Sequence, residues 1–182
     1  MQNYHFKVLK NPKTQNYLDL KDWVLSENFL WAYHETSTPR IEEEPMGKGQ
    51  HINVPYYTHT FLLRPETNRY SSLYHSSPED LQRVIRVIDE IAKANDVKFT
   101  SYVRISANAV HPNKFGSYSL PHIDHTFPHG QIILYLTDAG GNTYIEDVCH
   151  EPSEDDAIAF QGKHYMQTPY EERRVIIVAT FI

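Results

Sequence analysis

The sequence predicts an α+β fold in which N-terminal helices buttress a double-stranded β-helix, or jelly-roll, core. Helical patterns occupy the first half of the 182-residue chain, and the second half is a series of short β-branched and aromatic runs between proline and glycine turns. Helices followed by strands indicate α+β, and many short strands in series are typical of a jelly roll. We expect one domain over residues 1–182, with supporting helices and loops in 1–100 and the jelly-roll core in 101–182.

Two segments of the first half carry helical patterns. Residues 17–33 begin with loosely periodic apolar positions. A clearer helix begins at Ser77, which is a good N-cap, and Pro78 suits its first position. Its apolar residues follow the spacing of a single buried face: Leu81, Val84, Ile85, Ile88, Ile91 and Ala92. We expect this helix to end near residues 94–95 and to pack against a sheet.

Residues 34–77 read as loops with short strands, because four prolines are scattered among polar residues. The runs HINVPYY and THTFLL within this segment suit short strands. The stretch from Leu62 to Ser77 contains Arg64, Arg69, Tyr70 and Tyr74. It has the composition of a substrate lid, and exposed loops without a role have the same composition.

Strand-like runs then follow one another to the end of the chain. Their sequences are KFTSYVRIS, GQIILYL, NTYIED, DAIAF and RRVIIVATFI. Each is rich in β-branched or aromatic residues, and turns separate them. This half of the chain therefore predicts the strands of the jelly roll.

Composition narrows the function classes. The net charge of −6 disfavours a protein whose main task is to bind nucleic acid. No apolar run approaches the roughly 20 residues of a membrane helix, and the N-terminus shows no signal peptide. Cys149 is the single cysteine, which excludes an internal disulfide and makes a reducing cytoplasm the expected compartment.

The stretch SLPHIDHTFPHG predicts a metal site. On a strand, His122 and Asp124 would project from the same face, and His164 is the best candidate for a third ligand. Two histidines and a carboxylate form the facial triad of non-haem Fe(II) oxygenases. A lone H-x-D also occurs by chance, and the same donors bind zinc in some hydrolases. His125 and His129 suit surface positions beside the site.

A cosubstrate of such an oxygenase carries two carboxylates, so a cation is needed beyond the metal. Arginine is preferred, because its planar fork binds a carboxylate bidentately. Arg173 and Arg174 open the last strand-like run, after His164. Adjacent residues of a strand face opposite sides, so only one of the two arginines can point into the barrel. The alternative is that both lie at a strand edge and discourage aggregation.

Residues 101–182 resemble the catalytic core of the 2-oxoglutarate- and Fe(II)-dependent oxygenases, in the prolyl 4-hydroxylase-like branch. The resemblance rests on six motifs in order: HID, YLTD, GGNT, PSEDDAIAF, KHYMQTP and ERRVIIV. Thr137 and Asp156 depart from the family pattern, which has Asn and Gly at these places. Neither position is that of a ligand. Residues 1–100 match less specifically, and substrate loops would lie there.

The resemblance implies a role for each matching residue. His122, Asp124 and His164 would bind Fe(II). Arg174, at the commoner spacing, would bind the far carboxylate of 2-oxoglutarate, and the Tyr135 hydroxyl would bind the same carboxylate. Tyr135 also suits a core aromatic position. Gly140 and Gly141 would form a hairpin turn.

The implied function is hydroxylation of a C–H bond, with 2-oxoglutarate and O2 as cosubstrates, Fe(II) as cofactor, and release of succinate and CO2. Ascorbate would act as an accessory reductant. A protein side chain such as prolyl is the leading substrate and a small metabolite the second, while nucleic acid and membrane partners are disfavoured. The alternatives are a cupin-type metal-binding isomerase or sugar-binding module, and a non-catalytic scaffold. Cupins usually carry a second histidine where Asp124 stands, which favours the oxygenase.

Overall fold

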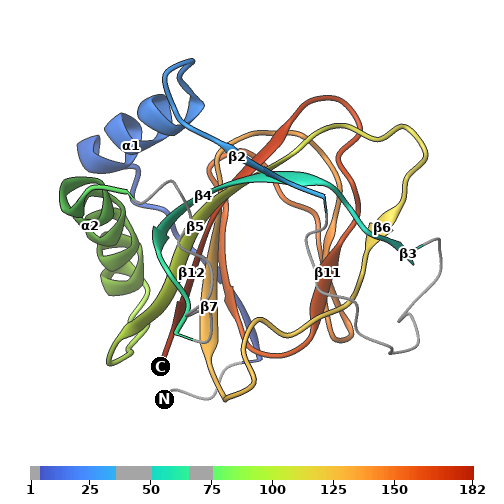
Figure 1. Ribbon diagram of the computed structural model, residues 1–182. Coiled ribbons are helices and arrows are strands. Elements are labelled where there is room, and N and C mark those ends of the chain that lie inside the picture. The colour runs from blue at the N-terminus through green and yellow to red at the C-terminus, as the bar shows by residue number, and fades with distance from the viewer. Residues whose placement is uncertain (1–4, 36–50, 66–75) are drawn as a thin grey trace.

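The computed structural model describes residues 5–35, 51–65 and 76–182 (Figure 1). Two helices are present in this part of the chain, α1 (Gln15–Leu25) and α2 (Pro78–Ala94). The first strands are β1 (Phe6–Leu9), β2 (Ala32–His34), β3 (His51–Ile52), β4 (Tyr56–Leu62), β5 (Tyr102–Val110) and β6 (Tyr118–Ser119). The later strands are β7 (Gly130–Tyr135), β8 (Thr143–Ile145), β9 (Val148–His150), β10 (Ala157–Phe160), β11 (His164–Met166) and β12 (Arg174–Phe181).

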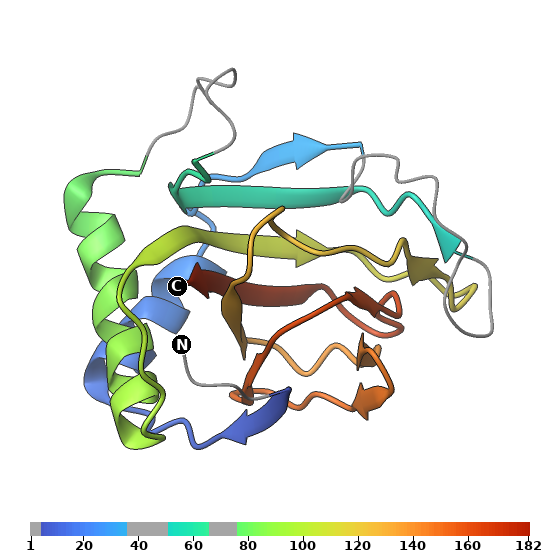
Figure 2. The same ribbon diagram turned by 90° about the horizontal axis from the view of Figure 1, so that it is seen from below.

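A large antiparallel sheet forms one wall of the molecule, in the order β1-β10-β7-β12-β5-β4-β2. Figure 2 shows β4, β5 and β12 side by side within it. The smaller sheet β11-β8-β9 and the parallel pair β3-β6 lie across from it, so that the strands form a ring in Figure 1. This arrangement is a jelly roll, as the series of short strands predicted.

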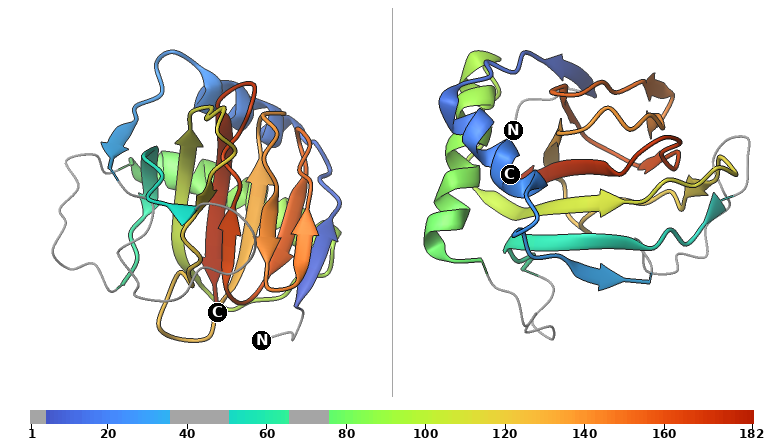
Figure 3. Two further views of the ribbon diagram at one scale, coloured as in Figure 1. Left: turned by 90° about the vertical axis from the view of Figure 1, so that its right-hand side faces the viewer. Right: turned by 90° about the horizontal axis from the view of Figure 1, so that it is seen from above.

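The two faces of the large sheet bury different clusters. Along β12, Val175, Ile177 and Ala179 share an apolar core with residues of both helices. Ile176 and Val178 alternate with them and join a second cluster inside the ring of strands. Figure 3 shows α1 and α2 together on one side of the sheet. The face that the helices do not cover therefore lines the inside of the ring of strands.

Helix α2 follows the predicted pattern. The Ser77 hydroxyl accepts a hydrogen bond from Asp80 N at 3.1 Å, and Pro78 stands at the first helical position. The helix ends at Ala94, and its buried residues include Val84, Ile88 and Ile91. These observations confirm the expected start, end and apolar face. Neither helix among the described residues combines the length and apolar character needed to cross a membrane.

Helix α1 is tied to the turn before β10 by a charged cluster around Asp155. The carboxylate accepts hydrogen bonds from Tyr17 and Lys21 of the helix, and Lys13 Nζ lies 2.8 Å from its Oδ2. Burial by itself would raise the pKa of Asp155, but these partners outweigh burial and lower the pKa to about 2. The cluster thus fixes the N-terminal helix to the strand core.

The first hundred residues contribute more strands than expected. The runs HINVPYY and THTFLL, expected to form short strands, contain β3 and β4, whereas β1 and β2 were not expected. Strands β1, β2 and β4 all belong to the large sheet. Strand β4 pairs with β5 and places Thr58 opposite Asn108 inside the barrel. The inward side chain of Thr58 is polar, and the β-branched and aromatic residues of the run are what predicted the strand. Residues 36–50 and 66–75 of the predicted loop region lie outside the described residues.

Candidate metal centre

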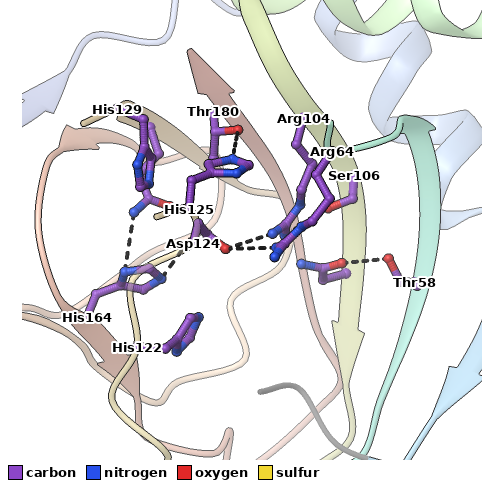
Figure 4. Close-up of polar contacts among 12 residues, drawn as sticks. Thr58, Arg64, Arg104, Ser106, His122, Asp124, His125, His129, His164 and Thr180 are labelled. Carbon is purple, nitrogen blue, oxygen red and sulfur yellow. Dashed lines mark hydrogen bonds and ion pairs between the residues drawn. The ribbon is translucent and has the colours of Figure 1, made fainter. Parts of the chain in front are cut away.

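His122 and His164 are brought together by backbone pairing rather than by a long strand. An isolated antiparallel bridge joins them, with His122 N donating to His164 O at 3.0 Å and His164 N donating to His122 O at 2.9 Å. Their imidazole ring centroids lie 4.4 Å apart. Asp124 follows two residues after His122, and Figure 4 shows its carboxylate turned toward His164, with His122 below that histidine. All three predicted ligands therefore meet in one place.

The two oxygens of Asp124 have different surroundings. Oδ1 accepts a hydrogen bond from Arg104 Nη1 at 2.7 Å and lies 3.4 Å from Arg64 Nη2. Oδ2 lies 3.9 Å from His164 Nε2. The arginines thus engage one oxygen and leave the other facing the histidine. This division suits a carboxylate that donates a single oxygen to a metal.

Protonation states in the cluster also suit a metal. Burial alone would raise the pKa of Asp124, but the charge of Arg104, followed by His164, His122 and Arg64, holds that pKa well below its usual range. Burial lowers the pKa of His164 to about 3, so its imidazole is neutral at pH 7. A metal site of this type needs a carboxylate and neutral imidazoles, and Asp124 and His164 are already in these forms.

The remaining ring nitrogens are held by nearby groups. His122 Nδ1 lies 3.0 Å from Leu120 O, and His164 Nδ1 lies 3.4 Å from Gly162 O. Contact with a carbonyl keeps the proton on Nδ1 and leaves the Nε2 lone pair for a metal. The Gln131 amide lies 3.3 Å from His164 Nδ1. Its Oε1, which has no hydrogen-bond partner, would accept that proton if the amide turned over.

The donor set matches an Fe(II) ion in type, and its geometry is slightly open. Among the residues that the structure describes, no three His, Cys, Asp or Glu side chains are drawn together as tightly as metal ligands. Two ligand atoms at about 2.1 Å from one metal, at right angles, lie about 3 Å apart. The 3.9 Å between Asp124 Oδ2 and His164 Nε2 therefore has to close by roughly 1 Å.

Arg174 points into the barrel, on the same face of β12 as Ile176 and Val178. It is 3% exposed, and its guanidinium donates to Gly141 O at 2.9 Å and to Thr143 Oγ1 at 2.7 Å. Tyr135 lies beneath it, with the guanidinium carbon 5.2 Å from the ring centroid and the hydroxyl 2.8 Å from Thr143 Oγ1. Arg174 Nε is buried without a partner, and no acidic side chain among the described residues forms an ion pair with Arg174.

Arg173 points the other way. Its guanidinium lies over the Trp31 ring, 5.7 Å from the centroid. Its carbonyl accepts a hydrogen bond from Thr137, whose hydroxyl also receives the Val175 N–H. The departure at Thr137 therefore serves the backbone at the start of β12. Of the two adjacent arginines, Arg174 alone faces the interior.

No protein-family model matches the sequence, and no curated protein matches it. A prolyl hydroxylase from Trichoplax adhaerens, solved with a hypoxia inducible factor peptide fragment, matches with a TM-score of 0.53 and 11% identity, over 97% of this chain and 83% of that chain. An oxidoreductase of the 2OG-Fe(II) oxygenase family from Burkholderia pseudomallei matches with a TM-score of 0.51 and 11% identity, over 69% of this chain and 68% of that chain. The chain has the fold of the 2-oxoglutarate- and Fe(II)-dependent oxygenases.

A cupin domain from Bordetella pertussis also matches, with a TM-score of 0.35 and 11% identity over 46% of this chain and 84% of that chain. A TM-score this low carries no argument about the present chain.

Some residues beside the cluster of His122, Asp124 and His164 were not predicted from the sequence, or were predicted at the wrong depth. His125 and His129, which suited surface positions, are each 5% exposed. His125 Nε2 lies 2.8 Å from Thr180 Oγ1. The imidazole rings of His125 and His129 contact each other edge to face. Arg104 was not singled out, although a charged residue between Val103 and Ile105 in a buried strand is the signal that marks it.

The substrate lid predicted for Leu62–Ser77 is described only in part. Arg69, Tyr70 and Tyr74 lie outside the described residues. Arg64 lies within them, beside Asp124.

Proposed function

We propose that this chain is a 2-oxoglutarate- and Fe(II)-dependent dioxygenase that hydroxylates a C–H bond and releases succinate and CO2. One observation carries the proposal. Arg174 holds a buried positive charge without a carboxylate partner among the described residues, inside the same barrel as the His122, Asp124 and His164 cluster. An isolated buried charge is costly, so an anionic ligand is the expected counterpart.

In this proposal the protein holds both ends of the cosubstrate. His122, Asp124 and His164 would hold the metal, and Arg174 with Tyr135 would receive the far carboxylate. Bound Fe(II) supplies the redox chemistry with O2 and 2-oxoglutarate. Arg104 keeps Asp124 ionised and fixes its free oxygen toward His164. Ascorbate would keep the iron reduced between turnovers.

The interior face of β4 and β5, beside the apolar residues Ile176 and Val178 of β12, offers a surface for the substrate. Thr58 of β4 donates to Asn108 Oδ1 of β5 at 2.8 Å, and Ser106 Oγ accepts from Arg104 at 3.3 Å (Figure 4). These groups suit a polar substrate. We propose a protein side chain, prolyl first, and a small metabolite second. The peptide in the Trichoplax prolyl hydroxylase structure is the reason to test peptides first.

The proposal also covers the organisation of the chain. Residues 1–182 act as a single oxygenase domain, α1 and α2 buttress the sheet, and 101–182 hold the catalytic groups. A cytoplasmic location goes with it, because the single Cys149 is free and exposed, as a reducing compartment allows.

A turnover assay tests the proposal. Purified protein with Fe(II), ascorbate and isotope-labelled 2-oxoglutarate should form labelled succinate only when O2 is present, and peptide or metabolite pools that contain the substrate should increase the rate. His164→Ala should abolish the reaction, and His111→Ala, an exposed histidine, should not. Metal-dependent hydrolysis or isomerisation without O2 consumption would move the protein to the zinc hydrolase or cupin class.

A further inference from the structure

A second buried nitrogen accompanies Arg174 in the barrel. In the antiparallel pair of β8 and β9, Thr143 lies directly opposite His150. Directly opposed residues share a face of the sheet. Because Thr143 points inward and accepts a hydrogen bond from Arg174, His150 also projects inward beside this group.

The surroundings of His150 agree with this direction. Its side chain is 10% exposed, and its ring packs near Tyr135 and Phe6, at centroid distances of 5.6 and 6.0 Å. Its Nε2 is buried without a hydrogen-bond partner. Burial lowers the pKa of His150, Asp156 raises it, and the nearby Arg174 lowers it. His150 therefore lies within the electrostatic reach of the inward arginine.

Asp156 does not satisfy the His150 nitrogen. Its Oδ2 lies 3.7 Å from His150 Nε2, beyond hydrogen-bond distance. The same oxygen already accepts the Ser153 N–H at 3.0 Å, and the side chain is 35% exposed. The cluster of Arg174, Tyr135, Thr143 and His150 thus contains two buried nitrogens without partners, Arg174 Nε and His150 Nε2.

Both unpartnered nitrogens can donate a proton, and buried donors are rarely left without acceptors. A carboxylate has two oxygens and accepts several hydrogen bonds. One carboxylate placed beside Arg174 therefore satisfies donors that no group of the described protein satisfies. The imidazole meets this demand in its neutral form when the proton is on Nε2.

We propose that His150 is a second protein ligand of the far carboxylate of the cosubstrate, acting together with Arg174. The proposal rests on the function proposed above. It makes His150 a specificity-determining residue for 2-oxoglutarate, distinct from the residues that hold the metal. His150 lies at the end of β9, whereas Tyr135 and Arg174 lie on β7 and β12.

Titration calorimetry of 2-oxoglutarate into the anaerobic Mn(II)-loaded protein tests the proposal without turnover. His150→Phe keeps an aromatic ring against Tyr135 and removes the donor. It should weaken binding by about tenfold to a hundredfold, the scale of a hydrogen bond to a charged group. His150→Gln, which can donate through its amide, should stay within about threefold of the wild type. His111→Phe makes the same change at an exposed position and should have no effect.

The outcomes separate this inference from the function on which it rests. Normal affinity in folded His150→Phe, together with lost affinity in Arg174→Gln, overturns the role of His150 alone. Absence of 2-oxoglutarate binding in the wild type overturns both. Melting temperatures show whether each variant is folded. If His150→Phe does not fold, the ring nitrogen signals of ¹⁵N-histidine-labelled wild type decide instead: the His150 signal should shift on addition of 2-oxoglutarate, and an unmoved signal contradicts the proposal.

Discussion

Replacing Arg174 with glutamine should remove 2-oxoglutarate binding while leaving the fold nearly as stable. The substitution removes two hydrogen bonds, to Gly141 O and Thr143 Oγ1, each worth about 1 kcal/mol. It also removes a buried charge whose desolvation costs several kcal/mol and which no described acid offsets. The two effects oppose each other, so we expect a change of roughly 2 kcal/mol or less in the free energy of unfolding.

Cosubstrate affinity responds differently, because truncating one partner of a buried charge pair costs about 2–5 kcal/mol. This corresponds to a loss of about thirtyfold to several thousandfold. Arg173→Gln is the matched control, since Arg173 only covers the Trp31 ring. This half-buried cation–π contact on the helix side of the sheet contributes about 1 kcal/mol to stability and does not touch the inside of the barrel.

A thermal-shift measurement with the Mn(II)-loaded protein compares the two variants. A ligand that binds only the folded state raises the melting temperature. Added 2-oxoglutarate should therefore raise it in the wild type and in Arg173→Gln, but not in Arg174→Gln. The reasoning is wrong if Arg173→Gln loses the shift while Arg174→Gln keeps it.

Three further predictions follow from the structure. His164→Ala should lower Mn(II) affinity by at least about tenfold in calorimetry, because the substitution removes a metal ligand. His129→Ala should leave the Mn(II) affinity unchanged, and equal losses in the two variants would mean that the ligand set is misassigned. The pKa of Asp155 is lowered in the folded state to about 2, so its charge contributes stability above pH 4 that is lost as the pH falls toward 2. In urea unfolding, the wild type should be roughly 1–2 kcal/mol more stable than Asp155→Asn at pH 6, and the difference should disappear by about pH 2. A stability difference that does not change with pH would refute this. Gly141 has φ +80°, and a Cβ there would lie 2.6 Å from Gln167 O, so Gly141→Ala should lower the free energy of unfolding in urea by about 1–3 kcal/mol. Gly116→Ala is the control and should cost less, because φ there is +64° but the nearest atom is 4.0 Å away. Equal costs would show that the protein relieves the contact at Gly141.

The strands of the second half could be predicted because their side chains are strongly β-forming, and α2 because its cap and apolar face are both explicit. The run THTFLL predicted a short strand where β4 lies, but not the place of β4 in the large sheet, which depends on its pairing with β5. Strands β1 and β2 were not predicted. Alternation could not give the direction of Arg174, because both faces of β12 are buried. The spacing implied by the family resemblance pointed to Arg174, and in the structure this side chain does face inward.

The candidate site divides in the same way. The spacing of His122 and Asp124 predicted two neighbours, and the bridge between His122 and His164 brings in the third. Arg104 and His150 were not singled out. Arg104 reaches Asp124 from strand β5, 20 residues away in the sequence. The hairpin of β8 and β9 places His150 opposite Thr143, and only the fold brings Arg174 beside this pair.

The most direct test of the central claim is an anaerobic titration of 2-oxoglutarate into the Fe(II)-loaded protein, followed by visible absorption. When a 2-oxo acid chelates Fe(II) through its carboxylate and keto oxygens, charge transfer from the metal to the ligand gives a new band. We predict that the band appears in the wild type, saturates at one 2-oxoglutarate per chain, and is absent without Fe(II) and in His164→Ala. No band in the wild type, or an unchanged band in His164→Ala, would contradict the account.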